Sequence, residues 1–122
     1  MRFKISTITL FVLLFVSCSK VKQEVPHPDL TGCRDTLFFF DTDILPIMNV
    51  NCNFTECHST SGRGSYDFTK YPVVANVAKS GALEYRLELP DDDPQHMPED
   101  MKLSKCDENT IIAWIRQGYP EK

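Results

Sequence analysis

The chain has 122 residues, a formal net charge of −4 and five cysteines. This length allows one small domain with a modest core, and not two. The acidic balance argues against nucleic acid and anionic lipid as ligands, and it fits a protein partner with a basic docking surface.

The first residues have the pattern of an export signal. Two basic residues precede the uncharged run Ile5–Val16, which is long enough for a signal peptide but shorter than the roughly twenty residues of a membrane span. The run ends on Ser17 and Cys18, an arrangement that resembles the lipobox of bacterial lipoproteins, in which the cysteine is lipidated. We therefore expect a signal peptide over residues 1–17, and lipid on Cys18 that anchors the exported chain at the outer membrane or its periplasmic face. Ordinary cleavage near Ser17 is the alternative.

Residues 18–31 are polar and contain two prolines, which is typical of a tether. His27 lies in this stretch and is expected to be solvated. The remaining residues, 32–122, are expected to form the single domain. A domain of roughly a hundred residues is small enough for a cross-link or a bound cofactor to contribute much of its stability.

A short helix is expected to begin at Ile44 and to end at Cys52. Before it, the apolar cluster Leu37–Phe40 is too short for a helix and is expected to pack as an extended segment. Asp41–Asp43 offer N-cap side chains, and Pro46 is tolerated only in a first turn. The apolar face of this helix consists of Ile44, Ile47 and Met48.

Two more helical pieces are expected after a polar loop over residues 59–67. Thr69 is the expected cap of the first piece, which ends near Gly81, and residues 82–89 form the second. The buried stripe of the first piece is expected to be Tyr71, Val74, Val77 and Ala78.

Residues 90–102 are rich in proline and acidic residues, which predicts a surface loop. A last helix follows, with Ser104 and Asp107 as a capping box and Gly118 with Pro120 at its end. Its apolar face consists of Ile111, Trp114 and Ile115. The expected fold class is therefore all-α with long loops, and such loops exceed what a compact domain usually tolerates unless something holds them.

The stretch "CNFTECH" places Cys52, Cys57 and His58 within seven residues. In a reducing compartment this pattern would indicate zinc, whereas exported thiols must be paired, coordinated or otherwise consumed. Covalent haem attachment consumes both thiols and uses the following histidine as an iron ligand, with a usual spacing of Cys-x-x-Cys-His. The two extra residues here must bulge outward. These seven residues alone leave haem, a Cys52–Cys57 disulfide and a metal site open.

Other segments match a known pattern: "CRDT", "ILPIMNVNC" leading into "CH", "YDFTKYPVV", "HMPEDMKLS" and "CDENTIIAWIRQGYP". With these segments, residues 32–122 resemble the small c-type cytochrome domains of exported bacterial lipoproteins, particularly those of the Bacteroidetes. Some members of that family have the longer spacing between the haem cysteines. Where the family often has glycines after "MP", this chain has Glu99 and Asp100.

The resemblance implies a cytochrome c-like helical domain around one covalently attached haem c. Cys52 and Cys57 would form the thioether bonds, and His58 and Met97 would be the axial iron ligands. Ligation by histidine and methionine fills both axial positions, which suits electron transfer. The implied function is a monohaem single-electron carrier that is not an enzyme. His96 and Met101, in the same loop as Met97, are the less favoured ligands.

If haem consumes Cys52 and Cys57 and lipid consumes Cys18, only Cys33 and Cys106 are left to form a disulfide. That bond would close a loop of about seventy residues and stabilise the domain by roughly 4 kcal/mol through loop entropy. Two alternatives stay open. One is a structural or zinc-binding lipoprotein that is stapled by disulfides and has no haem, and the other is a haem sensor with an open iron position.

Overall fold

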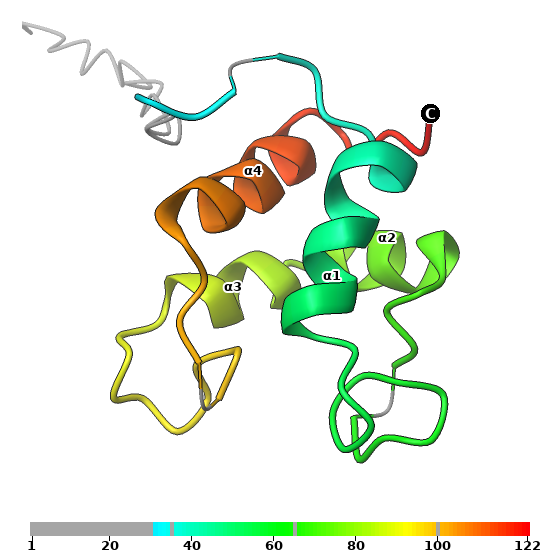
Figure 1. The fold of residues 1–122 in the computed structure, drawn as a ribbon, viewed down its shortest axis with the longest axis vertical. Coiled ribbons are helices and arrows are strands. Elements are labelled where there is room, and N and C mark those ends of the chain that lie inside the picture. The colour runs from blue at the N-terminus through cyan, green and yellow to red at the C-terminus, as the bar shows by residue number, and fades with distance from the viewer. Residues whose placement is uncertain (1–30, 35, 65, 100) are drawn as a thin grey trace, which may run out of the picture.

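The computed structural model describes residues 31–34, 36–64, 66–99 and 101–122, which form helices and loops without a strand (Figure 1). The all-α prediction is therefore confirmed for this part of the chain. No helix within it is both long and apolar enough to cross a bilayer. The predicted signal peptide over residues 1–17, the lipidation site Cys18 and nearly all of the predicted tether, 18–31, lie outside the described residues.

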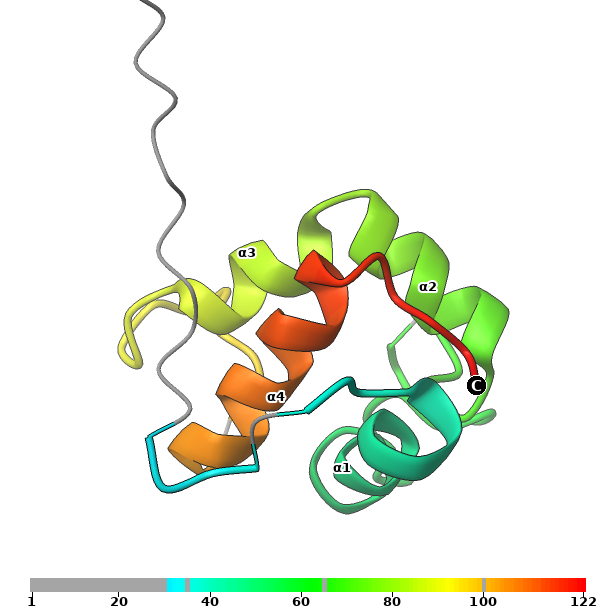
Figure 2. The ribbon, with the colours of Figure 1, turned by 90° about the horizontal axis from the view of Figure 1, so that it is seen from above.

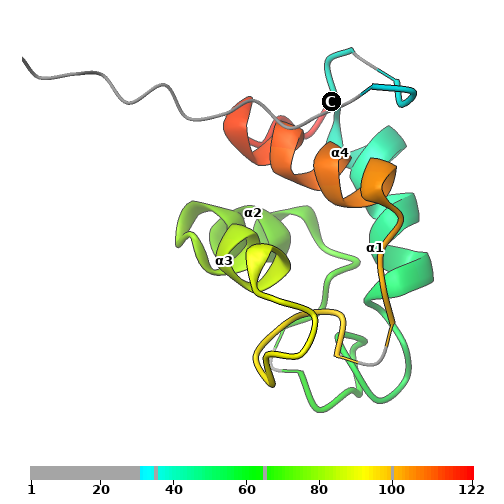
Figure 3. The same cartoon turned by 90° about the vertical axis from the view of Figure 1, so that its left-hand side faces the viewer.

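The helical elements are a π-helical turn, η1 (Phe40–Ile44), followed by α1 (Leu45–Asn51), α2 (Tyr71–Lys79), α3 (Ala82–Glu88) and α4 (Lys105–Arg116). Helix α4 contacts η1 and α3, and α3 contacts α2 (Figure 2). We call these elements, together with the C-terminal tail, the helical half. Two segments, 52–68 and 90–103, extend from the same end of the helices in Figures 1 and 3, and we call their described residues the loop end.

The core of the helical half is apolar and closely packed around Trp114. The ring of Phe40 lies 5.5 Å from that of Tyr71 and 6.1 Å from that of Trp114. Burying each such side chain contributes about 1.5 to 3 kcal/mol. The largest side chains with almost no exposed surface are Trp114, Phe38, Phe40, Ile44, Met48, Ile111 and Val74.

The first helix begins earlier than predicted. Phe38 and Phe40 are buried while Leu37 is exposed, so the segment before the helix is extended as expected. Asp41–Asp43, however, lie inside η1 and cap nothing that follows. Instead, the Asp43 carboxylate reaches back and accepts a 2.8 Å hydrogen bond from the Phe39 N–H, which satisfies a donor at the start of η1.

The predicted cap of α2 is also wrong. The N-cap residue is Lys70, and its side chain makes no capping bond. Thr69 instead donates its N–H and its hydroxyl to Asp67 Oδ1, at 3.0 and 2.6 Å, which directs its side chain toward the aspartate two residues earlier. The helix ends as predicted, and Gly81, with a φ of +79°, makes the turn from α2 into α3.

The last helix agrees with its sequence signals. Ser104 is the N-cap, and its Oγ accepts a 3.0 Å hydrogen bond from the Asp107 N–H. Gly118 has a φ of +86° and turns the chain back, so that Pro120 O accepts bonds from Trp114 Nε1 at 2.9 Å and from the Phe40 N–H at 3.0 Å. The C-terminal tail thus closes the helical half.

A disulfide joins Cys33 to Cys106. It is the pairing expected from the sequence, and it links the start of the domain to the first turn of α4.

Candidate functional site

Cys52, Cys57 and His58 lie together in a compact loop after α1. The Cys52 N–H donates to Met48 O at 2.8 Å, which places Cys52 at the end of α1. Six residues later the chain returns, because the His58 N–H donates to Cys52 O at 3.1 Å. The two extra residues of the motif are thus accommodated by a turn closed through a Cys57 N–H bond to Phe54 O at 2.9 Å.

Both thiols of this loop are free, and they differ in environment. Cys52 is half-buried against the core, whereas Cys57 is exposed. Burial, with a smaller contribution from the nearby Cys57, raises the pKa of the Cys52 thiol to about 12. The Cys52 thiol is therefore protonated at neutral pH.

The imidazole of His58 is held against the core. Its ring stacks on that of Phe68, with centroids 4.2 Å apart and planes 2° from parallel. Phe68 is buried, and its N–H donates to His58 O at 3.1 Å. Burial lowers the pKa of His58, and a backbone hydrogen bond at Tyr66 only partly opposes this. The imidazole is therefore neutral at pH 7, which is the form that binds metals.

Two glycines allow the loop to fold tightly over the motif. A Cβ atom on Gly62 would lie 1.9 Å from Cys57 O, and one on Gly64 would lie 2.5 Å from His58 Nδ1. Both positions therefore exclude any larger residue without a shift of the motif. Because Nδ1 faces the Gly64 backbone, Nε2 is the candidate ligand atom of His58.

The loop end has buried polar atoms without a hydrogen-bond partner and large apolar side chains that are exposed to solvent. In the described part of the chain, two buried side-chain atoms lack a hydrogen-bond partner of good geometry, Asn53 Oδ1 and His58 Nδ1. Three of the six large apolar side chains that are exposed there also belong to the loop end, namely Phe54, Tyr66 and Met101. Such features call for an explanation when they gather at one end of a small domain.

Met97 lies in the second segment of the loop end. Its N–H donates to Arg86 O at 3.1 Å, and its side chain lines a cavity of about 240 Å³. His96 is partly buried and its Nδ1 is 2.8 Å from Leu89 O, so one of its nitrogens is engaged within the loop. Met101 is 38% exposed.

The structure brings together only part of the predicted site. Cys52, Cys57 and His58 share one loop, but none of them lines the cavity that Met97 lines. The pairing of His58 with Met97 therefore stays a prediction. Among the described residues, no group of three or more histidine, cysteine or acidic side chains is arranged to hold a metal ion.

Sequence reasoning missed the residues that support His58. Phe68 lies ten positions after His58, and the segment "YDF" was its only signal in the sequence. Gly62 and Gly64 lie in the polar loop expected over residues 59–67, and no signal in the sequence marked them as close contacts of the motif.

Comparisons with family models, with curated proteins and with solved structures found no match for this chain. What the site does therefore has to be inferred from its own residues.

Proposed function

We propose that the protein is a monohaem c-type cytochrome that carries single electrons. The observation that carries this proposal is the convergence of two free thiols and a neutral imidazole in one tightly folded loop. Covalent haem attachment needs two thiols followed by a histidine, and that is the order of Cys52, Cys57 and His58.

The residues of the loop fit this cofactor. Cys52 and Cys57 would hold haem through thioether bonds, and His58 would ligate the iron through Nε2. The stack on Phe68 fixes the imidazole plane, and Gly64 leaves room for the ring on its Nδ1 side. When bound, haem supplies reversible one-electron exchange at its iron.

The unsatisfied groups of the loop end also support the proposal. A large, mostly apolar cofactor would cover exposed side chains such as Phe54 and Tyr66 and remove them from water. It would also give the two long loops a common packing partner, which loops of this length otherwise lack.

Met97 is the proposed second axial ligand. Its thioether is neutral and soft, and His/Met ligation raises the reduction potential of haem iron. His96 is less suitable because its Nδ1 is engaged with Leu89 O and its Nε2 lies 4.0 Å from Asp91 Oδ1.

The predicted lipobox and the acidic charge support a proposal for the location and the partner of the cytochrome. We propose lipid attachment at Cys18, an exported location at the outer membrane or its periplasmic face, and a redox partner with a basic docking surface. The acidic run Asp91–Asp93 lies in the same loop as Met97 and would orient such a partner.

Haem staining on a denaturing gel tests the attachment. The full chain is produced in a host with working c-type cytochrome maturation, and the band should stay coloured after denaturation. Cys57→Ala together with Cys52→Ala should remove the colour, whereas Ser61→Ala in the same loop should not. A colourless wild-type band would overturn the proposal and favour a lipoprotein without haem. Colour that survives Cys52→Ala alone indicates a single thioether.

Absorption spectra and the reduction potential test the ligand. Met97→Ala should abolish the weak long-wavelength band of the ferric protein, lower the potential and open the iron to exogenous ligands. Met101→Ala is the matched control and should leave all three unchanged. Loss of the band in Met101→Ala alone would move the assignment to that residue, and a wild type without the band would indicate an open iron position.

A further inference from the structure

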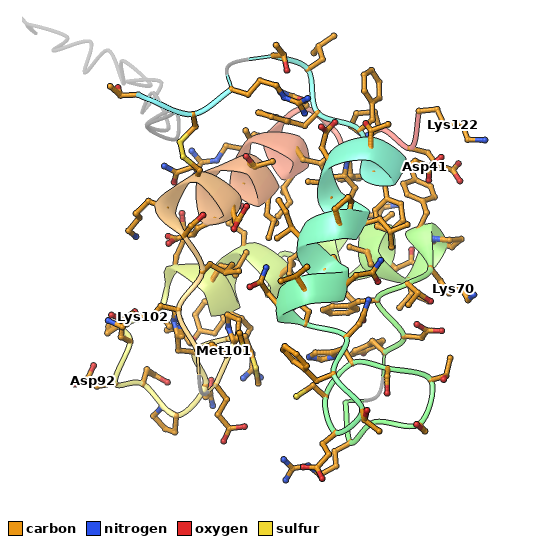
Figure 4. The ribbon with its side chains drawn as sticks, in the orientation of Figure 1. Asp41, Lys70, Asp92, Met101, Lys102 and Lys122 are labelled. Atoms are coloured by element: carbon orange, nitrogen blue, oxygen red, sulfur yellow. A yellow bond between two sulfur atoms is a disulfide. The ribbon has the colours of Figure 1, made fainter. Side chains whose placement is uncertain are left out.

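An ion pair closes the base of the loop that carries Met97. Asp91 follows α3 and Lys102 precedes α4, so the two residues stand at the two ends of the loop. Lys102 Nζ pairs with Asp91 Oδ2, although the side chains are 57% and 74% exposed for Asp91 and Lys102, respectively. In the view of Figure 4, Lys102 lies at the outer edge of this loop, near Asp92 and away from α1.

The same loop is attached to α3 at a second place. Arg86 O accepts the Met97 N–H at 3.1 Å, and Arg86 Nη1 donates to Gln95 O at 3.1 Å. These bonds hold the residues on both sides of His96, which itself contacts Leu89 O through Nδ1. These bonds fix the segment just before Met97. The Asp91–Lys102 pair joins the two ends of the loop.

The charges around the cavity beside Met97 are paired with each other. Lys102 pairs with Asp91, and Lys105 Nζ lies 2.8 Å from Glu108 Oε2. The cavity thus presents no unpaired lysine to an anionic ligand, even though four charged residues line it. The Asp91–Lys102 pair therefore ties the two ends of the loop together, whereas Lys105 and Glu108 pair within α4.

We infer that Asp91 and Lys102 are positioning residues that hold the loop in the conformation from which Met97 ligates the haem iron. This inference rests on the proposed function. Without the pair, the loop samples more conformations, and Met97 occupies its ligating position for a smaller fraction of the time.

Competition with imidazole on the ferric protein measures that fraction. An exogenous ligand must displace Met97, so its apparent affinity rises as the loop opens. Asp91→Asn should raise this affinity about two- to fivefold, the range for an exposed ion pair, and should weaken the long-wavelength band. Asp92→Asn is the matched control, because it removes the same charge from the next residue of the loop, and it should leave the imidazole affinity and the long-wavelength band unchanged.

Salt and a double variant sharpen the test. At about 1 M salt the imidazole affinity of the wild type should approach that of Asp91→Asn, because salt screens an exposed ion pair. Lys102→Gln should raise the imidazole affinity as much as Asp91→Asn does, and the double variant should raise it little further. The exchanged pair, Asp91→Lys with Lys102→Asp, should restore the wild-type affinity. Amide hydrogen exchange over residues 90–102 should quicken in Asp91→Asn and not in Asp92→Asn, which reports the loop independently of haem.

The outcomes separate the two claims. A wild type without covalently bound haem, or without the long-wavelength band, removes the proposed ligation and with it the role of the pair. If the wild type has haem and the long-wavelength band, but Asp91→Asn and Asp92→Asn bind imidazole with the same affinity, only the positioning role is overturned.

Discussion

The helical half and the loop end differ in how completely their apolar side chains are buried and their buried polar atoms are hydrogen-bonded. In the helical half, Trp114, Ile111 and Ile44 have no exposed surface, and the indole N–H of Trp114 is bonded to Pro120 O. In the loop end, His58 Nδ1 and Asn53 Oδ1 are buried without a partner of good geometry.

From this difference we expect the helical half to contribute most of the stability. A buried polar atom without a partner lowers the free energy of unfolding by about 1 to 3 kcal/mol, so the two such atoms of the loop end destabilise the fold. The apolar core and the Cys33–Cys106 disulfide must offset that cost. A loop end of this kind is explained if its residues are arranged for a cofactor, and the following predictions test whether the two regions are separable in this way.

The largest effect on stability is expected from the centre of the helical half. Trp114→Ala should lower the free energy of unfolding by about 3 to 5 kcal/mol, because it leaves a cavity and removes the bond to Pro120. Leu37→Ala is the control, since Leu37 is 67% exposed and should change little. Chemical denaturation measures both. A small loss in Trp114→Ala would mean that the core does not dominate stability.

Removal of the disulfide should have the next largest effect. Cys33 and Cys106 are 73 residues apart, so Cys33→Ser with Cys106→Ser should cost about 4 kcal/mol through loop entropy. Reducing agent should lower the stability of the wild type by a similar amount and leave the double variant unchanged. Non-reducing peptide mapping should find the two cysteines linked, and a Cys52–Cys106 link would contradict the assignment of the thiols.

A smaller effect is expected from the loop end. Gly64→Ala places a Cβ 2.5 Å from His58 Nδ1, and the resulting shift should cost about 1 to 3 kcal/mol. Ser61→Ala, exposed in the same loop, is the control. The variant should also alter the iron absorption of the haem-loaded protein. Unchanged stability together with an unchanged spectrum would show that Gly64 does not hold the imidazole.

The smallest effect concerns Asp67, at the border of the two regions. Hydrogen bonds from Thr69 hold the pKa of this carboxyl below its ordinary value of 3.8. A lowered folded-state pKa stabilises the protein above the unfolded value, and this contribution is lost as the pH falls through the folded value. Thr69→Val should therefore lower the melting temperature slightly at about pH 7, with the difference vanishing near pH 2. Thr60→Val is the control, and a difference that grows in acid would refute the assignment.

The sequence by itself determined the features that depend on neighbouring residues. The Ser104 cap, the turn at Gly118 and the order of Cys52, Cys57 and His58 each rest on signals a few positions apart. Such signals need no knowledge of the fold. They sufficed for the all-α class and for most of the helix boundaries.

Two predicted caps were lost to competition between neighbouring groups, and the remaining contacts were decided by the tertiary structure alone. Asp43, one of the predicted caps, accepts from the Phe39 N–H four residues earlier, and Thr69, the predicted cap of α2, donates to Asp67. The stack of Phe68 on His58 and the closure of the C-terminal tail onto Phe40 join residues brought together only by folding. Contacts of this kind depend on the path of the whole chain, and local periodicity carries no information about them.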